Sequence, residues 1–258
     1  LYGACRNLDV LPPLFKGIEA DYTRLGDLKF LELLAPDFLI LTFKPIKPDL
    51  SGYKQGFVNA AQNLIDGLGK HIPSLVIFVS STRIFAENDG RWINELSPRT
   101  KTDPLGKSIV EAEELLSGAG LPLVSLYCSG LYGFPTDYLV KRVKEGVISS
   151  KSEKSFTNRI HRQDVAGVFA WLIRSKLNQE RLQNAYIVSD SYPASRMEIE
   201  LWLSEKLGLS HFDRKKVDAL STRGGNKRCD NGQLLTSGYK LLYPDFKSGY
   251  ESILESLD

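Results

Sequence analysis

The chain has 258 residues, 42% of them hydrophobic and 25% charged, with a formal net charge of +2. That near balance of charge excludes the broad cationic surface that nucleic acids or anionic membranes require, and no apolar run is long enough to span a membrane. The three cysteines, Cys5, Cys128 and Cys229, are far apart, which excludes a disulfide framework or metal-ligand spacing and predicts a cytoplasmic protein.

Apolar runs and helical patterns alternate along the first half of the chain. Strands are predicted at residues 1–5, 38–42, 75–79 and 123–128, with a weaker one at 18–21, and helices at 56–68 and 107–116. Such alternation predicts an α/β fold with a parallel sheet and helices on both faces. Because crossovers between parallel strands are right-handed, we expect the sheet to be doubly wound.

The pattern of predicted strands and helices changes after about Tyr132. Helices are predicted at residues 138–145, 163–174, 196–207 and 247–257, and short strands at 156–161 and 185–188. We therefore expect a large domain over residues 1–132 and a small C-terminal lobe over residues 133–258. The lobe has few apolar residues, so we expect it to interleave with the sheet and close over the carboxyl edge.

Five segments carry a family resemblance by their type and order. They are VIFVSSTRIF (76–85), NELSPRTKTDPLGKSIVEAEELL (94–116), LYCSGLYG (126–133), NRIHRQDVAGVF (158–169) and NKRCDNGQLLTSGYKLLYPDF (226–246). Together they resemble the extended short-chain dehydrogenase/reductase family of nucleotide-sugar epimerases and dehydratases, and within it an atypical branch of epimerase-like proteins. The resemblance implies a Rossmann fold that binds NADP or NAD, and an oxidoreductase or epimerase acting on a sugar-like or nucleotide-linked small molecule.

The cofactor half of the family pattern is incomplete in this sequence. The family's G-x-G-x-x-G turn is absent, so we expect the first strand, glycine turn and first helix to lie upstream of Leu1; the alternative is a lost pyrophosphate site. Arg6, after a strand like the family's second, favours the 2′-phosphate of NADP over NAD, unless it is only a solvated loop residue. Asp21 matches the family aspartate that binds the adenine amino group, with a loop residue or helix cap as the alternative.

The resemblance also places other residues along the cofactor. They are Tyr22, Thr42, Phe43, Lys44, Ser80, Gly130 and Leu131. Phe43 and Lys44 depart from the family, which usually has small residues where this strand passes under the cofactor. Lys44 is expected either to meet a phosphate or to be solvated.

The catalytic half of the pattern has one match and two departures. The resemblance places Ser81 at the family's catalytic hydroxyl, but Leu105 and Ile109 stand where the family has its tyrosine acid/base and, one helical turn later, the lysine that lowers the tyrosine pKa. The sequence therefore leaves two hypotheses open. The chain is either an enzyme with another proton relay, for which Tyr132 and Lys107 are candidates, or a non-catalytic NADP-binding sensor or scaffold.

The segment NRIHRQDVAGVF predicts a strand-to-helix junction. Thr157 aligns with the family arginine that binds the pyrophosphate of a nucleotide-sugar. Arg159 is two residues later and therefore on the same strand face. It is expected either to bind substrate or to form a surface salt bridge. His161 is expected to be structural, and Asp164 to cap the helix that follows. We expect a homodimer as in the family, and no metal, nucleic-acid or membrane partner.

Overall fold

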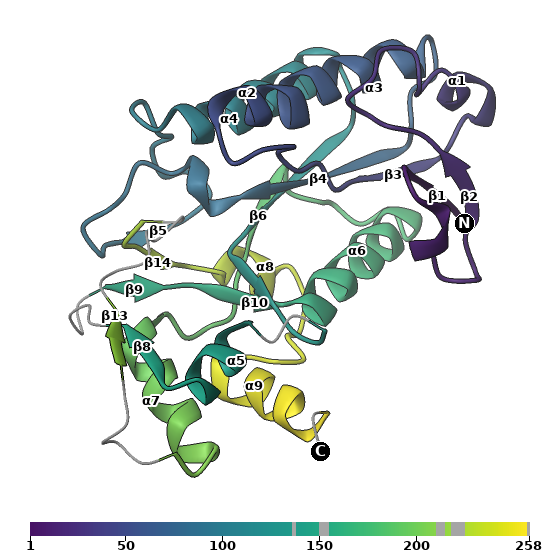
Figure 1. The fold of residues 1–258 in the computed structure, drawn as a ribbon. Coiled ribbons are helices and arrows are strands. Elements are labelled where there is room, and N and C mark those ends of the chain that lie inside the picture. Colours follow the sequence, from purple (N-terminus) through teal and green to yellow (C-terminus); the bar gives the residue numbers. More distant parts are fainter. Residues whose placement is uncertain (136–137, 150–154, 210–214, 218–224, 257–258) are drawn as a thin grey trace. The chain divides into compact units, whose positions relative to one another are not determined.

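The computed structural model describes residues 1–135, 138–149, 155–209, 215–217 and 225–256. The chain divides into two units (Figure 1): unit 1 is Leu1–Ser80 with Lys101–Ser125, and unit 2 is Ser81–Thr100 with Leu126–Asp258. This division groups residues 81–100 with the C-terminal half, whereas the sequence prediction places residues 1–132, with returning segments, in the large domain. No helix within the described ranges is both long and apolar enough to cross a membrane.

Unit 1 holds the predicted alternation of strands and helices. Its elements are β1 (Tyr2–Cys5), the 3₁₀ helix Leu8–Val10, β2 (Lys16–Glu19), α1 (Phe30–Leu34), β3 (Phe38–Leu41), α2 (Leu50–Tyr53), the π-helix Lys54–Asn59, α3 (Ala60–Leu68), β4 (Leu75–Ser81), α4 (Pro104–Gly118) and the start of β6 (Leu123–Cys128). Figure 1 shows α2, α3 and α4 side by side.

Two helices of unit 1 begin earlier than the apolar pattern predicts. The chain is helical from Leu50 because Asp49 accepts a hydrogen bond from the Gly52 N–H at 2.7 Å and caps the first turn. Similarly, α4 begins at Pro104 because Asp103 accepts from the Leu105 N–H at 3.1 Å, and proline suits the first helical position. Caps rather than apolar periodicity therefore set both starts.

Unit 2 contains short strands and several helices. Its elements, besides the end of β6, are the 3₁₀ helix Thr82–Ile84, β5 (Trp92–Ile93), β7 (Gly130–Tyr132), α5 (Tyr138–Lys144), β8 (Val147–Ser149), β9 (Phe156–Thr157), β10 (Arg159–His161), α6 (Arg162–Leu177), β11 (Ala185–Val188), β12 (Ala194–Ser195), α7 (Arg196–Lys206), β13 (Lys215–Val217), β14 (Arg228–Cys229), α8 (Gly232–Thr236) and α9 (Phe246–Glu255). The single strand predicted at 156–161 is two strands, broken at Asn158. The predicted end of the last helix, at residue 257, lies outside the described residues.

The predicted parallel α/β sheet is confirmed. In unit 1, β6 lies beside β4, and β4 pairs in parallel with β3; in unit 2, β6 continues beside β11. Val76, Ile77 and Phe78 of β4 are 0% exposed, because a strand of a parallel sheet is covered on both faces. β1 and β2 form a separate parallel pair. The polar residues after β3 and β4 therefore stand where parallel strands end.

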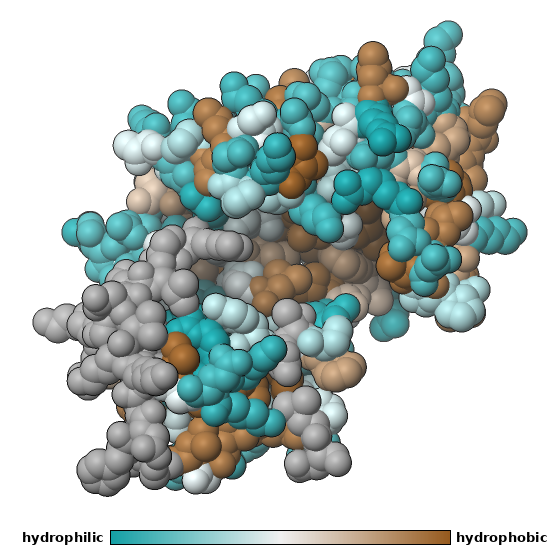
Figure 2. Space-filling model, viewed as in Figure 1, coloured by the Kyte–Doolittle hydropathy of each residue, from teal (hydrophilic) through white to brown (hydrophobic). Residues whose placement is uncertain are grey.

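Apolar side chains are exposed around β1 (Figure 2). They belong to Leu1, Tyr2, Leu8, Val10 and Leu14, which are between 40% and 86% exposed. The strand that leads to Arg6 thus borders an uncovered apolar surface of unit 1. Surfaces of this kind commonly mark contacts with another molecule or segment.

One hydrophobic cluster of unit 2 contains residues from β7, α5, β12, α7 and α9. It consists of Tyr132, Val140, Val143, Ala194, Ile199, Leu203, Phe246, Tyr250 and Ile253. The strands around it pair locally, β7 with β10 and β8 with β13 in parallel, and β9 with β12 antiparallel. Helices therefore supply most of the side chains in this cluster.

The prediction that Asp164 caps α6 is wrong. The cap is His161, whose Nδ1 accepts from the Gln163 N–H at 3.3 Å. Asp164 lies inside the first turn, is 0% exposed, and accepts hydrogen bonds from the Tyr239 hydroxyl and from the backbone N–H groups of residues 242 and 243. The aspartate therefore ties the segment before α9 to the start of α6, a contact between residues distant in sequence.

Candidate functional site

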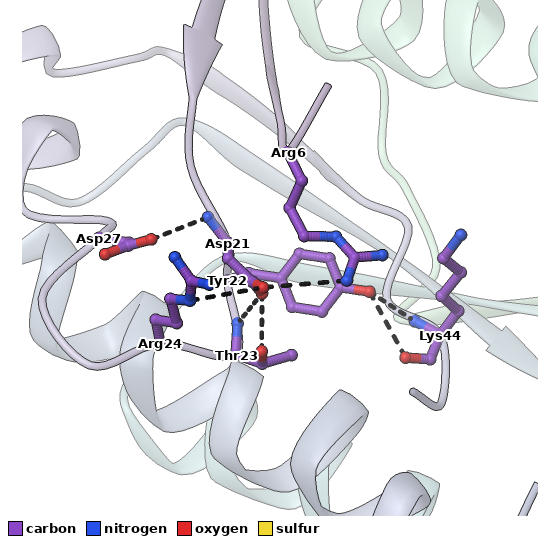
Figure 3. A network of polar contacts seen from close by, with 7 residues as sticks. All are labelled: Arg6, Asp21, Tyr22, Thr23, Arg24, Asp27 and Lys44. Carbon is purple, nitrogen blue, oxygen red and sulfur yellow. Dashed lines mark hydrogen bonds and ion pairs between the residues drawn. The ribbon is translucent and has the colours of Figure 1, made fainter. Parts of the chain in front are cut away.

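Arg6 and Asp21 meet at the ends of β1 and β2. The two strands are parallel, with Cys5 opposite Glu19, so the residues after them leave the same edge. Figure 3 shows the Asp21 carboxylate between two guanidinium groups: its Oδ2 is 3.9 Å from Arg6 Nη1 and 3.9 Å from Arg24 Nε. The Arg6 and Arg24 side chains are 64% and 75% exposed, whereas that of Asp21 is 12% exposed.

Local hydrogen bonds hold this carboxylate in place. Oδ1 of Asp21 accepts from the Thr23 N–H at 2.9 Å and from the Thr23 hydroxyl at 2.6 Å. Burial alone would raise the pKa of Asp21, but the Thr23 hydrogen bonds and the charges of Arg6 and Arg24 together bring it below its ordinary value. Since each guanidinium has five N–H donors, both arginines keep donors for an external anion. The sequence prediction missed Thr23 and Arg24, although both lie within one turn of Asp21.

Tyr22 joins the end of β3 to this network. Its hydroxyl accepts from the Lys44 N–H at 3.2 Å and donates to the Lys44 carbonyl at 3.4 Å, so it fixes the backbone and leaves the exposed ammonium to solvent (Figure 3). Phe43 is 8% exposed and packs between the rings of Tyr22, at 5.0 Å, and Phe78, at 6.1 Å. A side chain at Gly56 would have its Cβ 2.1 Å from the Lys44 carbonyl oxygen, so only glycine allows this approach.

Two adjacent serines end β4 in different environments. Ser80 is 5% exposed, and its buried Oγ has no hydrogen-bond partner among the described residues. Ser81 is half-buried, and its Oγ accepts from the Arg83 N–H at 3.2 Å as the cap of the 3₁₀ helix. Because Oγ accepts this bond, the Ser81 hydroxyl proton is left to donate elsewhere.

The two positions at which the family has its catalytic tyrosine and lysine hold apolar residues in this chain, and both residues are at least partly buried. On α4, Ile109 is 2% exposed and Leu105 is half-buried. Lys107 is exposed, as is Thr42 after β3. Of the predicted catalytic residues, Lys107 belongs to unit 1, whereas Ser81 and Tyr132 belong to unit 2.

Four predicted residues come together on the ladder between β7 and β10. Gly130 lies opposite Arg159, and Tyr132 lies opposite His161, with the exposed Leu131 between them. Tyr132 is 7% exposed, and burial raises the pKa of its hydroxyl. A Cβ at Gly249 would lie 1.8 Å from that hydroxyl, which shows how closely α9 covers it. This environment makes Tyr132 a weak candidate for proton transfer.

Arg159 is a buried residue, so the alternative of a surface salt bridge is wrong. It is 7% exposed, donates to the Thr157 hydroxyl, and lies 5.9 Å from the Phe246 ring centre. Its Nη1 and the Oδ2 of the fully buried Asp190 have no hydrogen-bond partner among the described residues. Burial raises the pKa of Asp190 to about 7, although the charge of Arg159 acts in the opposite direction. Substrate could reach Arg159 only if side chains around it moved.

A buried tyrosine with an adjacent cation also occurs in unit 2. Arg99 donates from Nη2 to the Tyr127 hydroxyl, and the guanidinium lies 4.3 Å from that ring's centre. Tyr127 is only 2% exposed and also packs edge-on against Phe85. The pairing resembles an activated tyrosine in chemistry, but its burial favours a structural role.

Several solved structures are similar to this chain over nearly all of its length. A Methylobacillus flagellatus protein assigned to the NAD-dependent epimerase/dehydratases is 30% identical, with a TM-score of 0.79 over 98% of this chain and 88% of that one. The Bordetella bronchiseptica enzyme WbmG, in complex with NAD and UDP, is 19% identical, with a TM-score of 0.78 over 98% and 84%. A dTDP-4-dehydrorhamnose reductase from Bacillus anthracis, in complex with NADP, is 15% identical, with a TM-score of 0.72 over 96% and 93%. Neither the protein-family models nor the curated proteins gave a match.

Proposed function

Because the chain belongs to the NAD-dependent epimerase/dehydratase family, we propose that it is an NAD(P)-dependent oxidoreductase or epimerase/dehydratase of a sugar-like or nucleotide-linked small molecule. Two neighbours with the same fold support this substrate class by their names, the enzyme complexed with UDP and the dTDP-sugar reductase. The one observation that carries the proposal is Ser81, a half-exposed hydroxyl at the end of β4 with its proton available to a substrate oxygen.

The residues at the ends of β1 and β2 fit the adenosine end of NADP. Arg6 and Arg24 are two exposed guanidinium groups that share one carboxylate, and paired guanidiniums suit a phosphate monoester. We assign the 2′-phosphate to these arginines and favour NADP over NAD. Asp21, held in place by Thr23, would orient Arg6, and the Lys44 ammonium would add a positive charge nearby. A bound nicotinamide dinucleotide would supply hydride transfer.

The chain's own residues would orient the substrate. Ser81 would donate a hydrogen bond to the reacting oxygen, and one such donor is worth roughly a hundredfold or more in rate. Leu105 and Ile109 have aliphatic side chains that cannot transfer a proton, so the relay would use another group. Lys107 is the more accessible candidate and Tyr132 the less accessible one.

Leu105 and Ile109 also favour a second candidate function, which is dinucleotide binding without turnover. The packing of Ile109 and the half-burial of Leu105 suit a protein that binds dinucleotide without turnover, as a sensor or scaffold. Such a protein would retain the cofactor residues at the ends of β1 and β2. It would not depend on the Ser81 hydroxyl.

Turnover assays separate the two functions. NADPH and NADH oxidation would be followed with a panel of UDP-sugars, dTDP-4-keto sugars and simple carbonyl compounds. An enzyme should lose roughly a hundredfold in rate on Ser81→Ala, whereas Ser252→Ala, a half-buried serine of α9, should have no effect. Cofactor binding without turnover, both before and after the double change Leu105→Tyr with Ile109→Lys, would instead establish the sensor or scaffold.

A further inference from the structure

Lys227 places a buried ammonium group against the turn that follows Ser81. The side chain is 2% exposed, and Nζ donates to the Thr82 carbonyl at 3.2 Å and to the Phe85 carbonyl at 3.0 Å. All of these residues belong to unit 2, although Lys227 is more than a hundred positions from the turn in sequence. A buried ammonium is stable only where acceptors replace its water, so the two carbonyls and the ammonium fix each other's positions.

Ser81 and Lys227 act on opposite ends of one short turn. At the start, the Ser81 Oγ accepts from the Arg83 N–H at 3.2 Å. At the end, the Phe85 N–H donates to the Thr82 carbonyl over a long 3.4 Å. The Lys227 ammonium makes shorter hydrogen bonds to the carbonyls of Thr82 and Phe85 than this backbone bond. A single helical turn has little stability of its own, so the side chains at both ends determine its geometry.

The backbone of Lys227 is itself fixed on both sides. On one side, β14 pairs with β5, which places Arg228 opposite Trp92. On the other side, the Asn158 side-chain amide donates to the Lys227 carbonyl and accepts from the Cys229 N–H, both at 2.9 Å, and so takes the place of a neighbouring strand. The Asn158 that interrupts β9 and β10 therefore holds the lysine in position.

From these contacts we infer that Lys227 is a positioning residue for the Ser81 hydroxyl. Its ammonium holds the Thr82 and Phe85 carbonyls, which keeps the Arg83 N–H on Ser81 Oγ and directs the hydroxyl proton away from the turn. The catalytic consequence rests on the function proposed above, whereas the structural coupling of Lys227 to Ser81 does not. In this chain, where Ile109 stands in place of the family's lysine, Lys227 supplies a buried positive charge to the serine turn.

The coupling is testable without any substrate. Lys227→Met keeps the length of the side chain and removes its three donors. Amide hydrogen exchange of Arg83 should become about tenfold faster in this variant, the equivalent of one lost hydrogen bond. Exchange of Gln163, whose N–H is bonded to His161, should not change. Lys206→Met, which removes an exposed lysine paired with Glu251, is the matched control and should leave Arg83 as in the wild type.

The catalytic consequence needs a turnover assay and a double-mutant cycle. If Lys227 acts through Ser81, Lys227→Met should lower kcat with little change in KM, and the double variant with Ser81→Ala should be no slower than Ser81→Ala alone. Additive losses, or unchanged Arg83 exchange in Lys227→Met, would overturn the inference. If Lys227→Met does not fold, Lys227→Leu, which also lacks donors, replaces it, and unchanged Arg83 exchange in that variant is equally decisive. A wild type without turnover would refute the proposed enzyme, while the exchange experiment would still decide the role of Lys227.

Discussion

Replacing Asp164 by alanine should destabilise the protein far more than removing a helix cap. The carboxylate is 0% exposed and accepts from the Tyr239 hydroxyl at 3.0 Å, the Leu242 N–H at 2.7 Å and the Tyr243 N–H at 3.0 Å. Alanine would leave the two backbone N–H groups without their acceptor, whereas the Tyr239 hydroxyl would keep the carbonyl oxygen of residue 164, at 3.0 Å. Each unsatisfied buried group costs about 1–3 kcal/mol. We expect a loss of roughly 2–6 kcal/mol, a large fraction of the 5–15 kcal/mol that is typical of a folded domain.

Urea unfolding followed by circular dichroism measures this loss. The matched control is Asp245→Ala, because Asp245 is a true cap, accepting from the Ser248 N–H at 2.8 Å at the start of α9. Its loss should cost only about 1 kcal/mol. Tyr239→Phe, which removes one of the three donors, should fall between Asp245→Ala and Asp164→Ala. An Asp164→Ala variant no less stable than Asp245→Ala would refute the reasoning.

Three further predictions concern the other buried and charged groups. The pKa of Asp190 rises from 3.8 to about 7 on folding. The free energy of unfolding should therefore be highest below pH 4 and fall by up to about 4 kcal/mol as the pH rises to about 7. Urea midpoints across that range should show this decline in the wild type and not in Asp190→Asn. Arg6→Ala should weaken NADPH binding by about tenfold in calorimetric titrations and leave NADH binding unchanged, and equal effects on both cofactors would remove the assignment of the 2′-phosphate. Tyr132→Phe removes a buried hydroxyl without a hydrogen-bond partner in the described residues, so the unfolding free energy should change by less than about 1 kcal/mol, and any turnover should persist unless this hydroxyl transfers the proton.

The sequence by itself predicts the elements and the residues at their ends. Val76, Ile77 and Phe78 form an uninterrupted apolar run, and such a run becomes a strand covered on both faces wherever it is placed in a parallel sheet. Likewise, Arg6 and Asp21 follow consecutive strands, and consecutive parallel strands end at the same edge, so their proximity follows from local pattern alone. The family resemblance, carried by ordered motifs, is confirmed by the fold of the whole chain.

The tertiary structure alone decided which polar side chains are buried and what they hold. Asp164 has the local pattern of a cap, but its partners lie 75 to 79 residues away, and those of Lys227 lie 142 and 145 residues away. Arg159 likewise looks like a surface residue until Phe246 and Thr157 cover it. Periodicity and capping depend on neighbours within a turn or a strand, whereas these contacts depend on where a distant segment returns, which no local pattern encodes.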